Sequence, residues 1–122
     1  MIDFEAIKLE ELKKLILKND ATVEMKKGDV MAAKNVDVFL QDGVFKYAFT
    51  MAQNHISFHS MVMYSSPEIY ELTKKLFGKI GKLQKGCVNF KNLESIDVNL
   101  FDELMQASAK ADFSVVMSRY KK

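Results

Sequence analysis

The sequence predicts an α+β fold in which an antiparallel meander sheet carries its helices on one face. Three observations support this prediction. Apolar residues recur with a helical spacing near both ends of the chain, and they alternate with polar residues in the middle. A proline-led helix start and a short apolar strand follow the alternating region. No stretch rich in Ser, Gly or Pro separates two apolar segments, so we expect residues 1–122 to form a single domain.

The first element is expected to be an amphipathic helix over residues 3–18. Its apolar residues recur at spacings of three to five, as one face of a helix requires: Phe4, Ile7, Leu12, Leu15 and Ile16. Charged residues occupy the other positions, and Glu10 with Lys14 has the favourable i, i+4 spacing. Asn19 and Asp20 offer a stop.

Alternation predicts three strands in the next part of the chain. The first two cover residues 23–26 and 36–40, and Gln41-Asp42-Gly43 supplies the residues that a tight hairpin needs. The third strand covers residues 44–51. One of its faces is predicted to carry four large apolar side chains: Phe45, Tyr47, Phe49 and Met51.

A fourth strand is expected after a turn at Gln53 and Asn54. In this strand Ile56 and Phe58 alternate with three polar residues: His55, Ser57 and His59. We therefore expect Phe58 to lie in the core and the two histidines to lie on the opposite side of the strand.

The second half of the chain predicts further helices and one short strand. Ser65-Ser66-Pro67-Glu68 is a strong helix start, because Ser65 and Glu68 fit a capping box and proline is tolerated in the first turn. The helix is expected to run to about Phe77 and to close at Gly78 in a left-handed conformation. A strand over residues 85–90 follows, and Asp97 or Asn99 then caps a helix that precedes a final helical segment around residues 115–117.

The order of these segments resembles the YdhG-like domains of unknown function. The matching segments are the strand His55–His59, the helix that starts at Pro67, the strand Lys85–Phe90, and Ile96-Asp97 before the closing helix. The resemblance extends from about residue 23 to residue 111, and it departs at residues 24–28, where relatives place an aromatic residue and a proline. It implies a compact α+β cytoplasmic domain. Some members have been likened to frataxin-type iron chaperones, and the family supplies no agreed catalytic residues.

Polar residues on two neighbouring segments form a candidate ligand-binding groove. They occupy the face of the fourth strand that is opposite Phe58 and one face of the strand over residues 85–90: His55, Ser57, His59, Lys85 and Cys87. The two histidines are separated by about 13 Å along a strand, which is a poor spacing for chelating one ion. We therefore predict no metal site and no cofactor.

The sequence favours a non-enzymatic binding or interaction domain. No local signature of a cysteine enzyme surrounds Cys87, so we assign no catalytic residue. Two alternatives remain: a small enzyme that acts through Cys87, and a frataxin-like iron carrier or other metal carrier. An acidic ridge of the kind that iron prefers is not evident, because Glu5, Glu10 and Glu11 are interspersed with lysines.

The region between Leu72 and Leu93 contains six lysines and no acidic residue. Lys79 and Lys82, in a predicted polar connection, are the candidate anion-binding residues. They do not belong to a P-loop, because the G-x-x-x-x-G-K-[ST] spacing is missing and the segment follows a helix.

Composition narrows the expected partners. Eighteen Lys plus Arg residues against sixteen Asp plus Glu residues give a net charge of +2, which does not by itself indicate nucleic acid or a membrane surface. The sequence has no apolar run long enough to span a bilayer, and its single cysteine is typical of the cytoplasm. We expect a small ligand or a protein as partner, anionic if the lysines bind it, and the sequence also allows a homodimer.

Overall fold

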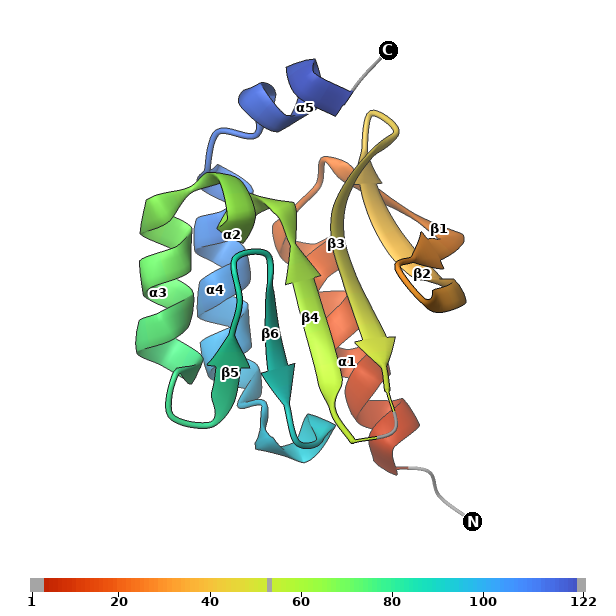
Figure 1. Ribbon diagram of the computed structural model, residues 1–122, viewed down its shortest axis with the longest axis vertical. Helices are drawn as coiled ribbons and strands as arrows, with labels where there is room; N and C mark the ends of the chain where they lie inside the picture. The colour runs from red at the N-terminus through yellow and green to blue at the C-terminus, as the bar shows by residue number, and fades with distance from the viewer. Residues whose placement is uncertain (1–3, 53, 121–122) are drawn as a thin grey trace.

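The computed structural model of this chain describes residues 4–52 and 54–120, and it contains a six-stranded antiparallel sheet with the strand order β1-β2-β3-β4-β6-β5. The strands are β1 (Val23–Val30), β2 (Ala33–Gln41), β3 (Val44–Met51), β4 (Ile56–Ser60), β5 (Gly81–Leu83) and β6 (Cys87–Phe90). The first four form the predicted meander, and the β5–β6 hairpin joins the sheet with β6 beside β4 (Figure 1). Asp3 and Gln53, which the sequence places at a helix start and in a turn, lie outside the described residues.

The long helices form a layer on one face of this sheet, as predicted, and the last helix lies at one end of the molecule (Figure 1). They are α1 (Phe4–Asn19), α2 (Met61–Ser65), α3 (Pro67–Phe77), the 3-10 turn η1 (Leu93–Ser95), α4 (Val98–Lys110) and α5 (Ser114–Tyr120). The helix α4 lies between α1 and α3 and packs against both. Within the described residues, none of the helices combines the length and apolar character needed to cross a bilayer.

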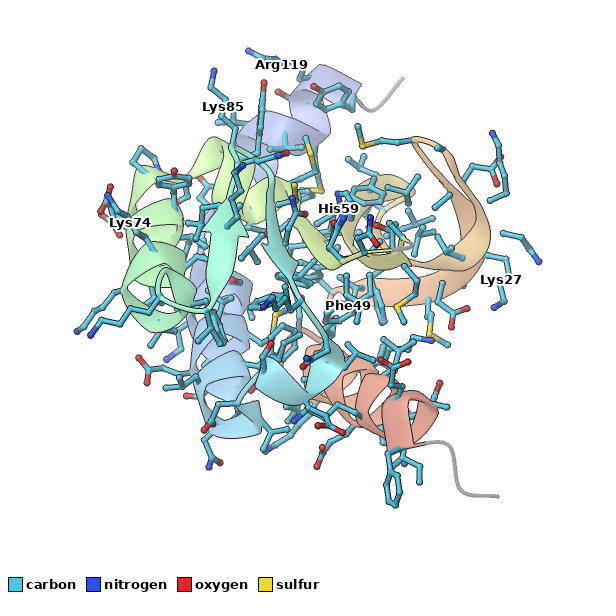
Figure 2. The ribbon with its side chains drawn as sticks, turned by 60° about the horizontal axis from the view of Figure 1, so that its bottom comes forward. Lys27, Phe49, His59, Lys74, Lys85 and Arg119 are labelled. Carbon is cyan, nitrogen blue, oxygen red and sulfur yellow. The ribbon has the colours of Figure 1, made fainter. Side chains whose placement is uncertain are left out.

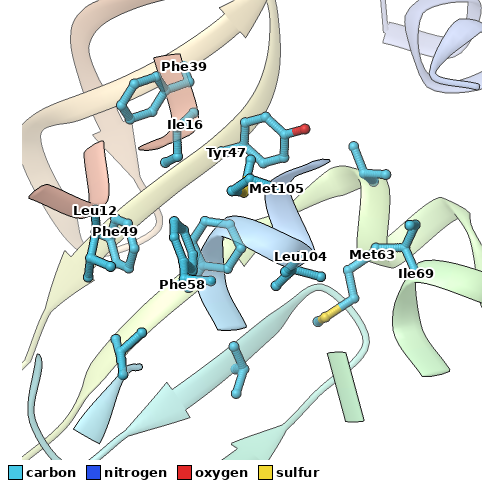
Figure 3. Packing of buried hydrophobic residues seen from close by; sticks show 14 of the residues in the cluster. Leu12, Ile16, Phe39, Tyr47, Phe49, Phe58, Met63, Ile69, Leu104 and Met105 are labelled. Atoms are coloured by element: carbon cyan, nitrogen blue, oxygen red, sulfur yellow. The ribbon is translucent and has the colours of Figure 1, made fainter. Parts of the chain in front are cut away.

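Aromatic side chains between the sheet and the helices form the centre of the core. The ring of Phe58 on β4 lies 5.0 Å from that of Phe49 on β3 and 5.1 Å from that of Phe101 on α4, between ring centroids. Leu12 and Ile16 of α1 cover the same cluster (Figure 3). The prediction that Phe58 is a core residue is confirmed.

A β-bulge in β3 corrects one predicted face. Phe39 pairs with Tyr47 and Leu40 pairs with Phe45, so Lys46 is an extra residue on β3. An extra residue reverses the alternation of the strand. Tyr47 and Phe49 therefore face the helices, whereas Phe45 packs in a second, smaller apolar cluster with Val30, Val38 and Ala48. The predicted common face was therefore wrong for Phe45, because the sequence pattern does not reveal the bulge. Tyr47, Phe49 and Met51 keep one face, since Met51 pairs with the buried Ile56.

The bulge residue Lys46 forms a buried ion pair with Asp20. Its ammonium nitrogen lies 2.7 Å from a carboxylate oxygen of Asp20, and the two side chains are 2% and 1% exposed. The same Asp20 oxygen accepts a hydrogen bond of 2.8 Å from the hydroxyl of Tyr47, and the Lys46 ammonium lies 4.9 Å from the ring centroid of Phe113. Burial alone would raise the pKa of Asp20, but hydrogen bonds from Lys46, Thr22 and Tyr47 together lower it. This pair joins the end of α1, the start of β1, β3 and the segment before α5.

The predicted apolar face of α1 is buried only in its second half. Leu12 and Ile16 are fully buried, but Phe4 and Ile7 are 67% and 58% exposed. Apolar spacing marks a helix face, yet it does not specify how much of that face has a partner to pack on.

The ends of α3 differ from the prediction, although its span agrees with it. Ser66, rather than Ser65, caps the helix by accepting a hydrogen bond of 3.3 Å from the amide of Ile69. The hydroxyl of Ser65 instead donates to the carbonyl of Val62, at the end of α2. Gly78 is right-handed, with φ −62°, rather than left-handed. A Cβ atom there would lie 2.5 Å from the carbonyl oxygen of Lys74, so the position requires glycine for close approach.

Two further parts of the prediction concern β5 and α4. Residues 81–83, expected in a polar connection, form the edge strand β5, which is too short to show alternation in the sequence. Of the two expected caps for α4, Asp97 is the one observed, because its carboxylate accepts from the amides of Asn99 and Leu100.

Removing one partner of the buried ion pair is expected to destabilise the fold. Asp20→Asn leaves the Lys46 ammonium without its counter-charge, and we expect the free energy of unfolding to fall by about 3–5 kcal/mol. Lys46→Met should have a similar effect, and the double variant should lose less than the sum of the two single losses. Urea melts of all three variants measure this coupling. A loss in the double variant equal to the sum of the two single losses would mean that Asp20 and Lys46 are not coupled.

The ion pair also predicts a dependence of stability on pH. Because the pKa of Asp20 is lowered in the folded state, its stabilisation is complete above the ordinary carboxyl pKa of 3.8 and is lost as pH falls through the lower folded value. Asp20→Asn should therefore lose less stability than the wild type between about pH 5 and pH 2. Equal losses of stability in the wild type and in Asp20→Asn would mean that the pKa of Asp20 is not lowered by folding.

The opposite faces of β4 predict different costs for two neighbouring substitutions. Phe58→Ala opens a cavity in the aromatic cluster and should cost about 3–5 kcal/mol. His59→Ala removes a half-buried side chain with one hydrogen bond and should cost less than about 1 kcal/mol. Denaturant melts compare them, and similar losses would mean that the orientation of β4 is wrong.

Candidate functional site

The face of the sheet away from the helices carries a row of polar side chains. The strand register pairs Thr50 with Ser57, Ser57 with Asn89, and Asn89 with Lys82, so these four residues form one line across β3, β4, β6 and β5. The adjacent line pairs His59 with Cys87. Because β4 and β6 both alternate regularly, their polar residues share this face while Phe58 and Val88 face the core.

These lines border a hollow of about 560 Å³, which we call the sheet groove. One side is largely apolar and consists of the β1–β2 turn and the end of β3: residues 30–33 and 50–52. The other side is polar and brings together four of the five predicted groove residues, His55, Ser57, His59 and Cys87, with Gln84 and Asn89. Gln84 and Asn89 were missed, although Asn89 stands at the i+2 position from Cys87, where alternation places a side chain on the same face.

Hydrogen bonds connect the polar side chains of the sheet groove. A ring nitrogen of His59 lies 2.8 Å from the hydroxyl of Thr50, and the Ser57 hydroxyl donates to the side-chain oxygen of Asn89 at 2.5 Å. The thiol of Cys87 lies 3.3 Å from the side-chain oxygen of Gln84. Burial lowers the pKa of His59 and raises the pKa of Cys87, so the imidazole and the thiol are both neutral at physiological pH.

This arrangement does not activate Cys87 as a nucleophile. A reactive cysteine needs a stabilised thiolate, but here burial disfavours the charged form. The contact with the Gln84 oxygen favours the protonated thiol as well, because an amide oxygen accepts a hydrogen bond and repels a negative charge. The groove therefore offers neutral hydrogen-bonding groups beside an apolar wall.

Lys85, the fifth predicted groove residue, lies elsewhere. It is in the turn before β6 and borders a separate hollow with Tyr64, Tyr70 and Glu71. Figure 2 shows Lys85 near the end of the molecule where Arg119 lies, away from His59. The prediction placed Lys85 and Cys87 on one strand, but β6 begins at Cys87 and the alternation does not continue through the turn.

The two predicted anion-binding residues, Lys79 and Lys82, meet in a second hollow of about 640 Å³, which we call the lysine hollow. A third lysine, Lys91, also lines it, and the hollow shares His55 and Asn89 with the sheet groove. Its other lining residues are Asn54, Ile80, Phe90, Asn92 and Ser95. Lys91 was missed, although it follows Asn89 at the i+2 spacing that keeps side chains on one face.

The described residues show no cluster suited to a metal ion. No three His, Cys, Asp or Glu side chains in residues 4–52 and 54–120 are close enough to bind one together. Several carboxylates are held by lysines instead. Asp37, for example, lies 2.7 Å from the ammonium of Lys13 and 2.8 Å from that of Lys27.

Comparisons with known proteins identify the fold. No family model matches the sequence, and no curated protein matches it. The structure is similar to the crystal structure of YdhG, a DUF1801 family protein from Bacillus subtilis, with a TM-score of 0.58 and 11% sequence identity. The match covers 94% of this chain and 81% of the YdhG chain. The expected resemblance to the YdhG-like domains is thus confirmed for the fold.

The environment of Cys87 predicts slow thiol chemistry. Alkylation by iodoacetamide should be slower for the folded protein than for the chain unfolded in urea at neutral pH. The pH midpoint of the alkylation rate should lie above the ordinary thiol pKa of 9.0 in the folded protein, because burial raises it. A midpoint below that of the unfolded chain would indicate an activated thiolate and would favour an enzyme acting through Cys87.

Proposed function

We propose that this chain is a non-enzymatic binding domain that holds a small ligand in the sheet groove. One observation carries the proposal: a line of neutral, mutually hydrogen-bonded polar side chains faces an apolar wall across a hollow. Sites for small molecules typically combine apolar lining with a few fixed polar groups. Ser57 is buried although it lies on the side of the sheet away from the helices, so this face is more enclosed than a solvated sheet surface.

The apolar wall supports a ligand with an apolar part. Met31 is 85% exposed at the β1–β2 turn. It borders the groove, and methionine adapts its flexible side chain to many apolar shapes. Small side chains flank it, Ala32 in the turn and Ala33 at the start of β2.

Binding accounts for the polar wall better than the two alternatives do. An enzyme acting through Cys87 would require a thiolate, which burial disfavours. A frataxin-like iron carrier or other metal carrier would require grouped ligands, whereas Asp20 and Asp37 are held by lysines. A ligand that accepts and donates hydrogen bonds needs only the neutral groups that the groove presents.

A fragment screen followed by NMR amide shifts tests this proposal. We expect small amphipathic fragments to shift the amides of Thr50, Ser57, His59, Cys87 and Asn89. Replacing the groove methionine, Met31→Ser, should weaken the binding of such a fragment several-fold, because it removes apolar contact area.

Met25→Ser is the matched control for that experiment. Met25 is 43% exposed on β1 and does not border the groove, so its replacement should leave fragment binding unchanged. Fragment shifts that cluster around Tyr64, or equal effects of the methionine variants, would overturn the proposal.

A further inference from the structure

We infer that the ligand of this domain carries a phosphate group, and that the lysine hollow binds it. The inference rests on the proposed function only for the rest of the ligand, which would lie in the sheet groove. The phosphate subsite itself follows from the charge, the position and the hydrogen-bonding state of the residues that line the lysine hollow.

The charge of the lysine hollow is uncompensated. In the described part of the chain, six lysines form ion pairs with carboxylates, and all of them precede β4: Lys13, Lys18, Lys26, Lys27, Lys34 and Lys46. None of these described ion pairs includes Lys79, Lys82 or Lys91, and no Asp or Glu lines the lysine hollow. Three lysines thus border one concave surface that no described Asp or Glu lines.

The fold selects these three lysines from the lysine-rich run. Lys79 lies in the turn between α3 and β5, Lys82 lies on β5, and Lys91 directly follows β6. The β5–β6 pairing sets Lys82 opposite Asn89, which brings the three segments together. Lys74, from the same run, lies on α3 and points away from His59 (Figure 2). A lysine-rich surface that served only for solubility would not need this convergence.

Two neutral side chains of the lysine hollow, Asn89 and Asn92, are oriented as donors. The side-chain oxygen of Asn89 accepts from Ser57, and that of Asn92 accepts from the backbone amide of Ser95. Each amide therefore has its NH₂ group left to donate to a ligand. An oxyanion accepts hydrogen bonds only, so donors and ammonium groups together match it.

A phosphate group fits this set better than a single carboxylate. A phosphate monoester carries a charge of about −1.5 to −2 at neutral pH and has three acceptor oxygens. Lysine binds phosphate as a point charge. Three lysines can neutralise a phosphate dianion, whereas a single carboxylate would leave most of their positive charge uncompensated. Because His55 and Asn89 border both hollows, a phosphate in the lysine hollow can be continuous with an apolar body in the sheet groove.

Titration with inorganic phosphate, phenyl phosphate and benzoate, followed by NMR amide shifts, tests the inference. We expect phenyl phosphate to shift amides in both hollows, inorganic phosphate to shift those of the lysine hollow, and benzoate to bind more weakly than phenyl phosphate. Affinity for phenyl phosphate should fall as salt rises, since exposed charges are screened over about 8 Å at physiological ionic strength.

Two charge-reversal variants separate a local site from a general positive field. Lys79→Glu with Lys82→Glu should weaken phenyl phosphate binding at least about tenfold, with thermal stability nearly unchanged. Lys74→Glu with Lys75→Glu makes the same change in net charge outside the hollow and should weaken binding less than about twofold. Equal weakening by both variants would overturn the inference.

The outcomes also distinguish the inference from the proposed function. Fragments that bind the sheet groove while no phosphate shifts the lysine hollow would overturn the inference and leave the proposed function standing. Phenyl phosphate that binds at the lysine hollow, but is insensitive to Met31→Ser, would overturn the proposed function alone. A single-stranded oligonucleotide that binds more tightly than phenyl phosphate, and is weakened equally by both charge-reversal variants, would overturn the small-ligand phosphate site.

Discussion

The buried pair of Lys46 and Asp20 sets the orientation of the strands that carry the site. Two charges removed from water need full compensation, which Asp20 obtains from Lys46, Tyr47 and Thr22. Lys46 can reach Asp20 from the bulge of β3, and beyond the bulge Phe49 faces the helices. Because paired residues lie on the same side of a sheet, the register extends this orientation to the next strands: Phe49 pairs with Phe58, and Phe58 pairs with Val88. Consequently the polar residues of β4 and β6 can only face away from the helices.

The sheet surface away from the helices is divided into two parts with different chemistry. On the β1–β3 side, Val30, Val38 and Ala48 pack together in the small second cluster, which leaves the β1–β2 turn at the border of the sheet groove. On the β4–β6 side, the same surface carries hydroxyl, amide, imidazole and thiol groups. The sheet groove lies at this boundary, so the packing that closes one half of the surface also provides the apolar wall for the other.

The sequence predicted features that depend on local, regular alternation. The shared face of Ser57 and His59 was predictable because β4 is short and uninterrupted, and Phe58 marks its buried side. His55, which the sequence placed in the same strand, lies just before β4 and still borders the groove. Features that depend on tertiary contacts were not predictable. The reversal at Phe45 requires the bulge, and the separation of Lys85 from Cys87 requires knowing where the turn ends. The strand β5 was not predictable either, because three residues are too few to show an alternation of apolar and polar side chains.

The unpaired lysines are better explained by binding than by folding. Exposed ion pairs contribute only about 0–1 kcal/mol to stability, so leaving Lys79, Lys82 and Lys91 without carboxylate partners costs the fold little. Pairing them would instead neutralise the positive potential of the lysine hollow. Carboxylates are available elsewhere in the chain, where Asp37 alone contacts two lysines. The lack of described Asp and Glu residues in the lining of the lysine hollow therefore keeps this end of the sheet, which borders the groove, attractive to an anion.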